Sequence, residues 1–326
     1  MKYWPMKISV IVSSVFLLSL GACTKSGNGA SADNVYVAGA VLNGPKPEAK
    51  SWKNDILTPL SDSLSYGTAI VVSGNDVYVG GYETNDGIST SMYWKNGSPI
   101  LLTDGTDSGY RAAPNGYFPK TIDVSGTDVY VAGFSRYGNR TVAKYWKNGI
   151  ATILGDSASY AICLAASAAE VYVLGYEDGN AVYWSGGSPH ILQSGTSVPA
   201  VAAIAVSGSD VYVAGNSFAP MYWKNQTPVF LTDSFSTAST SAITVSGTDV
   251  YVAGYGQDAG GTLYAMYWKN GIPITLGKGQ GFSIAVSGTD VYVAGYSGPE
   301  AVYWKNGQLV SLAQRGQAYA IYVTKN

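Results

Sequence analysis

Few residues in this chain of 326 amino acids could carry out catalysis. It contains one histidine, His190, and two cysteines, Cys23 and Cys163. A His-based metal cluster or a Cys zinc site needs more ligands than these, and a Ser-His-Asp relay needs a histidine held beside its partners. His190 stands in residues 189–192, an outer segment where we expect a solvated side chain. These counts favour a protein with no metal site and no cofactor.

Carboxylates leave one catalytic chemistry open, because glycosidases need only two Asp or Glu residues at a suitable separation. Asp123 is the one acid in a series of short apolar segments of the type A-I-A-V, and no second acid occupies an equivalent position. It is either a catalytic group or a charged residue that lines a wet channel. Other acids recur at one turn position, where we expect each to cap the reversal through its own backbone: Asp76, Asp128, Asp210, Asp249 and Asp290, with Glu170 in a degenerate copy.

Aromatic and cationic residues gather where the repeat pattern described below is interrupted. Residues 103–120 contain Tyr110, Arg111, Tyr117 and Phe118, and residues 135–140 contain Arg136 and Tyr137. Four further aromatic residues stand just before A-I-A-V segments: Tyr66, Tyr160, Phe282 and Tyr319. Aromatic residues and Arg dominate binding hot spots, so we predict that these ten residues contact a ligand. The last four either ring the mouth of a channel or only plug the top of the core.

The elements that must position these residues come from a repeat. The pattern V-Y-V-A-G occurs seven times with small variations, and each copy is followed by a segment like Y-W-K-N-G. The copies centre on Tyr36, Tyr78, Tyr130, Tyr172, Tyr212, Tyr251 and Tyr292, so subtraction gives intervals of 42, 52, 42, 40, 39 and 41 residues. A period near 40 made of short alternating apolar runs is typical of the blades of a β-propeller.

Each unit supplies four antiparallel strands, in the order A-I-A-V, V-Y-V-A-G, Y-W-K-N-G and P-I-x-L. A Ser-Gly-Thr-Asp turn joins the first two strands, and an Asn-Gly turn joins the last two. Passing from the outermost strand of one blade to the innermost strand of the next means crossing a sheet, roughly 14 Å at about 4.8 Å per strand. Only the longer, irregular link before A-I-A-V can do this, so A-I-A-V is the innermost strand.

This order predicts how the ring closes. The chain enters at the second strand of a blade, in residues 34–60, and the matching innermost strand is found at the other end, in residues 319–323. We therefore expect an all-β, seven-bladed propeller over residues 34–326, closed by its C-terminal strand, which removes free sheet edges. The short turns all lie on one face and the variable loops on the other. Because loops on a rigid scaffold carry recognition, the variable-loop face should hold the ligand site.

The repeated tryptophans allow a functional and a structural interpretation. They are sugar-stacking platforms or, as we favour, fillers between neighbouring blades: Trp52, Trp94, Trp146, Trp184, Trp223, Trp268 and Trp304. Cys163 aligns with the first Ala of A-I-A-V, and we expect a small buried core residue rather than a nucleophile.

The N-terminal segment predicts export. Lys2 and Lys7 precede an apolar run that is too short to span a membrane, and Leu-Gly-Ala-Cys follows at residues 20–23. These four residues resemble the lipobox of bacterial lipoproteins, which implies a signal peptide over residues 1–22 and a lipid on Cys23. Residues 23–33 are then the lipidated cysteine and a flexible tether rich in Ser, Gly and Asn. The implied location is the bacterial cell envelope, at the outer membrane, on a periplasmic or a surface face.

As a whole, the chain from Cys23 onward resembles bacterial lipoproteins that carry a seven-bladed β-propeller. The formal net charge of −2 leaves no basic footprint for nucleic acid. We expect a membrane-anchored monomer without catalytic activity, which binds a glycan or an envelope protein through its variable-loop face. Two alternatives stay open: a polysaccharide hydrolase or lyase that uses a channel carboxylate such as Asp123, and a structural component of an envelope assembly.

Overall fold

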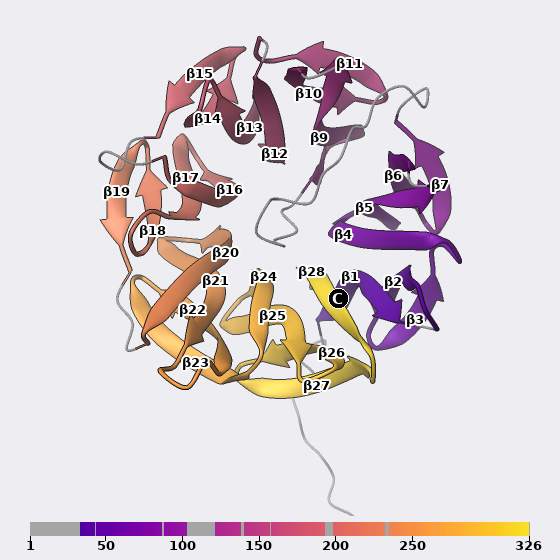
Figure 1. The fold of residues 1–326 in the computed structure, drawn as a ribbon, viewed down its shortest axis with the longest axis vertical. Coiled ribbons are helices and arrows are strands. Elements are labelled where there is room, and N and C mark those ends of the chain that lie inside the picture. The colour runs from indigo at the N-terminus through magenta and orange to yellow at the C-terminus, as the bar shows by residue number, and fades with distance from the viewer. Residues whose placement is uncertain are drawn as a thin grey trace, which may run out of the picture. The chain divides into compact units, whose positions relative to one another are not determined.

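The computed structural model describes residues 33–42, 44–86, 88–102, 121–137, 140–156, 158–192, 198–231 and 235–325. Within Asp33–Asn326, 28 strands form seven four-stranded antiparallel sheets, arranged as blades around an axis (Figure 1). The predicted all-β, seven-bladed propeller is therefore confirmed. None of the described segments is a helix long and apolar enough to cross a membrane.

The blades are numbered I to VII along the chain. From the innermost strand to the outermost, they consist of β28 (Gly316–Thr324), β1 (Asn34–Leu42), β2 (Pro47–Lys53) and β3 (Ile56–Pro59) in blade I; β4 (Leu64–Ser73), β5 (Asp76–Asn85), β6 (Ile88–Lys95) and β7 (Ser98–Leu101) in blade II; β8 (Ile122–Ser125), β9 (Asp128–Tyr137), β10 (Arg140–Lys147) and β11 (Ile150–Ile153) in blade III; β12 (Ser159–Ala166), β13 (Val171–Glu177), β14 (Asn180–Ser185) and β15 (Ser188–Ile191) in blade IV; β16 (Ala200–Ser207), β17 (Asp210–Asn216), β18 (Pro220–Lys224) and β19 (Thr227–Phe230) in blade V; β20 (Thr237–Ser246), β21 (Asp249–Gln257), β22 (Leu263–Lys269) and β23 (Ile272–Lys278) in blade VI; and β24 (Gln280–Ser287), β25 (Asp290–Ser297), β26 (Glu300–Lys305) and β27 (Gln308–Ala313) in blade VII.

The C-terminal strand closes the ring as the repeat predicts. β28 pairs antiparallel with β1, from Asn34 opposite Thr324 to Val41 opposite Gly316. It is longer than the predicted residues 319–323, because the pairing continues through Gly316 before the preceding turn. Residues from all seven innermost strands line one axial cavity of about 380 Å³, which confirms that A-I-A-V is innermost.

The tryptophans fill the seams between blades. Each one is at most 3% exposed. Trp94 of blade II, for example, packs in one cluster with Tyr36 and Ala49 of blade I, and Trp268 of blade VI packs with Tyr212 of blade V. The favoured structural interpretation is therefore correct, and the sugar-stacking interpretation is wrong, because rings this deeply buried offer no face to a ligand. Cys163 is a fully buried core residue, as predicted.

Five of the repeated turn acids, all aspartates, contact the second short turn of their blade. In blade II the Asp76 carboxylate accepts a hydrogen bond from Asn96 Nδ2 at 2.7 Å and lies 2.7 Å from Lys95 Nζ. Asn96 Oδ1 in turn accepts the Val77 amide at 2.8 Å, and Lys95 Nζ lies 5.3 Å from the centre of the Tyr78 ring. The same Asp-Lys-Asn-Tyr network recurs in blades III, V, VI and VII. The expectation that each Asp acts through its own backbone was wrong. Instead, the Asp side chain links the two short turns of its blade through its contacts with Lys and Asn.

The turn chemistry itself follows the expected rule. Asn96 has φ 51° and Gly97 has φ 83°, which is the left-handed pair that a tight hairpin requires. The same pair of positive φ values occurs at Asn148 and Gly149 and at Asn306 and Gly307.

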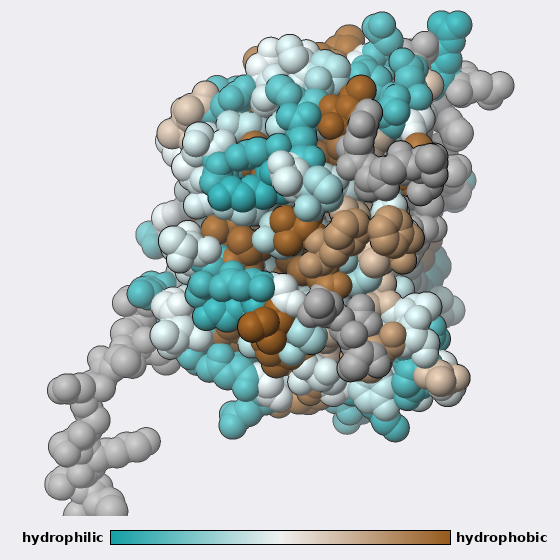
Figure 2. All heavy atoms as spheres, turned by 90° about the vertical axis from the view of Figure 1, so that its left-hand side faces the viewer, coloured by the Kyte–Doolittle hydropathy of each residue, from teal (hydrophilic) through white to brown (hydrophobic). Residues whose placement is uncertain are grey.

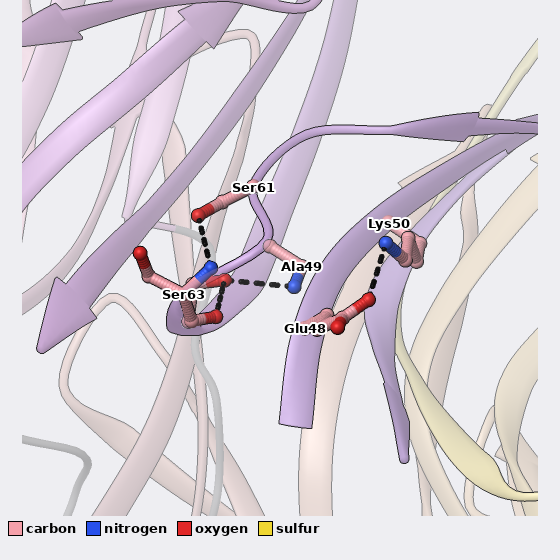
Figure 3. Close-up of polar contacts among 6 residues, drawn as sticks. Glu48, Ala49, Lys50, Ser61 and Ser63 are labelled. Carbon is pink, nitrogen blue, oxygen red and sulfur yellow. Dashed lines mark hydrogen bonds and ion pairs between the residues drawn. The ribbon is translucent and has the colours of Figure 1, made fainter. Parts of the chain in front are cut away.

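On the opposite face, serines tie the crossovers between blades to the sheets. The Ser65 hydroxyl at the start of β4 accepts the Ala49 amide at 2.9 Å and donates to the Ser63 carbonyl, and the Ser63 amide donates to Ser61 Oγ (Figure 3). Ser159 repeats this arrangement in blade IV, accepting the Ala143 amide at 2.9 Å. These fully buried hydroxyls hold the entrance of each of these innermost strands against the preceding blade.

Candidate functional site

The innermost strands share a β-bulge near the variable-loop face. In six blades the register between the innermost and second strands shifts by one residue at the same position. A bulge leaves one residue without a partner and re-aims its side chain, and such features are frequent beside binding sites. The bulged residues are Thr68, Ile162, Ala202, Ser241, Phe282 and Tyr319.

The glycine of V-Y-V-A-G makes room for this bulge. A Cβ built on Gly81 would overlap the carbonyl oxygen of Tyr66 and lie 2.9 Å from the Trp94 ring. The same backbone overlap occurs at the equivalent glycines of the other bulged blades, Gly39, Gly175, Gly215, Gly254 and Gly295. None of these glycines has a positive φ, so the requirement is space rather than backbone conformation. The motif glycine, the seam tryptophan and the bulge therefore form one structural unit.

The bulged positions vary in chemistry although the scaffold around them is uniform. Four of their side chains, Thr68, Ser241, Phe282 and Tyr319, line the axial cavity, and they include hydroxyl-bearing and aromatic groups. A uniform scaffold that presents different side chains at one level is suited to recognition of a specific ligand.

Two runs of aromatic rings, together called the collar, lie at the variable-loop end of the axis. Tyr66 stacks on Tyr82 with ring centroids 5.1 Å apart, and Tyr319 lies 6.2 Å from Tyr66 and 5.7 Å from Phe282. Phe282 continues to Tyr296 at 5.7 Å, so five rings from blades II, I and VII are in sequence. A second run joins Phe134, Tyr160 and Tyr176 in blades III and IV, with centroids 6.2 and 5.0 Å apart.

The four aromatic residues predicted for the channel mouth all belong to this collar, but they do not share one position. Phe282 and Tyr319 are the bulged residues, and at 6% and 5% exposure they both pack in the core and line the cavity. Tyr66 and Tyr160 stand two residues before the bulge, inside β4 and β12 rather than in a preceding loop, and are half-buried. Lining and plugging are thus combined in Phe282 and Tyr319, whereas Tyr66 and Tyr160 are not among the residues that line the cavity.

Burial strengthens the preference of five collar phenols for the neutral form. It raises the pKa of Tyr160 to about 12, and it also raises the pKa values of Tyr66, Tyr82, Tyr176 and Tyr296. Neutral phenols can both donate and accept hydrogen bonds. Tyr176 does both, donating to the Pro199 carbonyl at 3.1 Å and accepting the Val201 amide at 3.0 Å.

Asp123 lies in the axial cavity, where the sequence places it. Its carboxylate accepts the Val124 amide and, across the seam, the Ala166 amide of β12, both at 3.0 Å. The residue is 8% exposed and is the one carboxylate among the described residues that line the cavity. These contacts join the short strand β8 to blade IV.

Several predicted site residues lie outside the part of the chain that the structure describes. They are Tyr110, Arg111, Tyr117, Phe118 and the cysteine of the lipobox, Cys23. Arg136 and Tyr137 were expected in a loop; instead they end β9, opposite Thr141 and Arg140 of β10, because the hairpin extends beyond its repeat length.

The ligating residue types show no cluster. Among the residues that the structure describes, no group of three His, Cys, Asp or Glu side chains is placed to hold a metal ion. His190 is half-buried rather than solvated: its ring stacks on Tyr183 with centroids 4.7 Å apart, and its Nε2 lies 3.1 Å from Ser185 Oγ. At the turn that follows its tryptophan, blade IV has Ser185 and Gly186 where the other blades have Lys and Asn.

The sequence analysis did not predict four of the collar residues. They directly follow the V-Y-V-A-G glycine on the second strand: Tyr82, Phe134, Tyr176 and Tyr296. The signal was present, because five of the seven copies continue with Tyr or Phe at this position. The uniform second strand was interpreted as core throughout, although the residue that follows the motif glycine already lies at the variable-loop end of that strand.

Comparisons with known proteins bear on the fold. No family model matches the chain, and no curated protein matches its sequence. Among solved structures it is similar to a puromycin-hydrolyzing peptidase of Mycobacterium tuberculosis, with TM-score 0.53 and 13% identity over 82% of this chain and 50% of the peptidase. It is also similar to a prolyl endopeptidase, with TM-score 0.50 and 12% identity over 91% of this chain and 51% of that one. The chain spans about half the length of these peptidases, and at such low identity the likeness shows the propeller fold alone.

Proposed function

We propose that this protein is a non-catalytic binding module of the bacterial cell envelope, held to the membrane by a lipid on Cys23, which recognises a glycan at the variable-loop end of its axis. The observation that carries the proposal is the collar. At the variable-loop end of an otherwise repetitive scaffold, stacked aromatic rings and varied bulged side chains meet an axial cavity of about 380 Å³, whose lining continues along the innermost strands to residues such as Val286 and Val323 near the short turns.

The chemistry of the collar favours sugars. Aromatic rings pack against the apolar C–H faces of pyranose rings, and neutral phenols and hydroxyls exchange hydrogen bonds with sugar hydroxyl groups. The cavity volume lies at the low end of the range of about 300 to 1,000 Å³ that small-molecule sites occupy, so it would admit only the end of a glycan chain. The rest of the chain would lie across the collar.

Binding of the full-length protein, purified in detergent, to a panel of hexasaccharides and to envelope proteins tests this proposal. Tyr66→Ala should weaken binding by about tenfold, since it removes a stacked ring. Tyr93→Ala is the matched control, because Tyr93 is a half-buried tyrosine of the same blade that lies near the short-turn end of β6. Equal effects of the two variants, or binding to envelope proteins alone, would contradict glycan recognition at the collar. Mass spectrometry of the N-terminal peptide tests the lipid on Cys23 separately.

A further inference from the structure

The collar is interrupted at blade V. Where blades II and IV place Tyr66 and Tyr160, blade V has Ala200, and its bulged residue is Ala202. The aromatic residue that follows the motif glycine is replaced there by Asn216. Ala200, Ala202 and Asn216 therefore leave blade V without an aromatic ring at any of these three collar positions.

Buried hydroxyl groups without partners lie at this gap. Within the described part of the chain, Ser217 Oγ, Thr240 Oγ1 and Ser241 Oγ are buried and make no hydrogen bond. Thr240 and Ser241 are 0% and 4% exposed, and Ser241 lines the axial cavity. Asn216 Oδ1 accepts the Thr240 amide at 3.0 Å, which brings the loop that carries Ser217 against β20. Buried polar groups are almost always satisfied in folded proteins, so three unsatisfied hydroxyls in one sector point to a ligand that completes them.

An exposed aromatic pair lies on the outer side of the same blade. Phe218 is 79% exposed and directly follows Ser217, and its ring centroid is 5.2 Å from that of Phe230 at the end of β19, itself 49% exposed. Hydrophobic atoms gather on this side of the molecule, at the height of β18 and β19 (Figure 2). Exposed apolar patches of this kind mark interaction sites.

From these features we infer that blade V is the entry sector for the ligand. An uncharged oligosaccharide would rest on the Phe218 and Phe230 rings and continue inward, where its hydroxyl groups pair with Ser217, Thr240 and Ser241. The residues named in this sector carry no formal charge, so a neutral chain fits better than an acidic one. The inference rests on the proposed glycan binding and adds to it the path and the contacting residues.

Titration calorimetry of the full-length protein with cellohexaose, xylohexaose, laminarihexaose and chitohexaose tests this path. Phe218→Ala and Ser241→Ala should each raise the Kd of the bound hexasaccharide about tenfold, and Ser241→Thr, which keeps the hydroxyl, should restore most of the affinity. Ile272→Ala is the control: this side chain is 67% exposed at the start of β23, directly after the short turn of blade VI, and its loss should leave the Kd within about twofold. Thermal melting confirms that each variant is folded.

The outcomes separate this inference from the proposed function. If Phe218→Ala and Ser241→Ala bind like the wild type while Tyr66→Ala is weakened, the entry sector is refuted and glycan binding at the collar stands. If the wild-type protein binds none of the four probes, both are overturned.

Discussion

Replacing Gly254 of blade VI by alanine probes the link between motif, bulge and site. A Cβ at this position would overlap the Ser239 carbonyl oxygen and lie 3.0 Å from the Thr240 Cα atom. Both obstacles are backbone atoms of β20, so no side-chain rotation relieves them. The strand must move at the bulge, which displaces Ser241 from the axial cavity.

The size of the effect follows from overpacking. Extra methyl groups in a well-packed core cost typically about 1 to 3 kcal/mol, and a clash with backbone on a central strand belongs at the upper end, about 3 kcal/mol. At about 2 °C per kcal/mol for a domain of this size, Tm should fall by about 6 °C. Gly260→Ala is the control in the same blade, because its Cβ would meet only the Asp258 side chain, at 3.3 Å, and it should change Tm by no more than about 1 °C.

Differential scanning calorimetry of the two variants beside the wild type gives the comparison. Equal Tm values for Gly254→Ala and Gly260→Ala would show that the motif glycine is not required for space, and the explanation of the bulge would fail. A large loss confined to Gly254→Ala supports it.

Three further perturbations test other parts of the structure. Lys50→Met should lower stability by about 2 kcal/mol, because it leaves the Glu48 carboxylate, which lies 2.8 Å from Lys50 Nζ, without its ion-pair partner. Adding Glu48→Thr should restore stability, since the next copy of the repeat has Met92 and Thr90 at the positions of Lys50 and Glu48. Urea titration measures the free energy of unfolding of both variants. Trp268→Ala should cost about 4 kcal/mol by opening the seam between blades V and VI, and a loss below about 1 kcal/mol would refute its role as filler. The pKa values of five turn aspartates are lowered, chiefly by hydrogen bonds from Lys and, for Asp290, first from Asn306: Asp76, Asp128, Asp210, Asp249 and Asp290. Their contribution to stability is therefore present above about pH 4 and is lost as the pH falls through their folded pKa values. Tm measured from about pH 2 to 7 should show this drop, and replacing these aspartates by Asn should make the pH dependence of Tm flatter.

The architecture could be predicted from the sequence because it depends on repetition. The seven V-Y-V-A-G copies, the reach of the crossovers and the unmatched strand at the C-terminus together determine the blade order, and the structure confirms the closure of β28 on β1. The tryptophans were assigned correctly by the same logic, since seven equivalent seams need seven equivalent fillers.

The site could be predicted only in part. The Asp76 network joins two turns whose side chains meet only once the sheet is formed, so a local interpretation assigned the aspartate to its own turn. The bulge at Ser241 cannot be detected from the spacing of the V-Y-V-A-G copies, because the extra residue lies within one strand. Phe218 follows a motif copy but lies on the outer side of the blade, and its contact with Phe230 depends on sheet geometry rather than on sequence distance.

Hydrogen exchange of the full-length protein, with and without a saturating hexasaccharide, tests recognition at the variable-loop end most directly. Binding there should slow exchange at the start of the innermost strands, near Tyr66 and Ser241, and leave the Lys-Asn-Gly turns unchanged. Protection confined to those turns, or no protection anywhere, would contradict a ligand site at the collar.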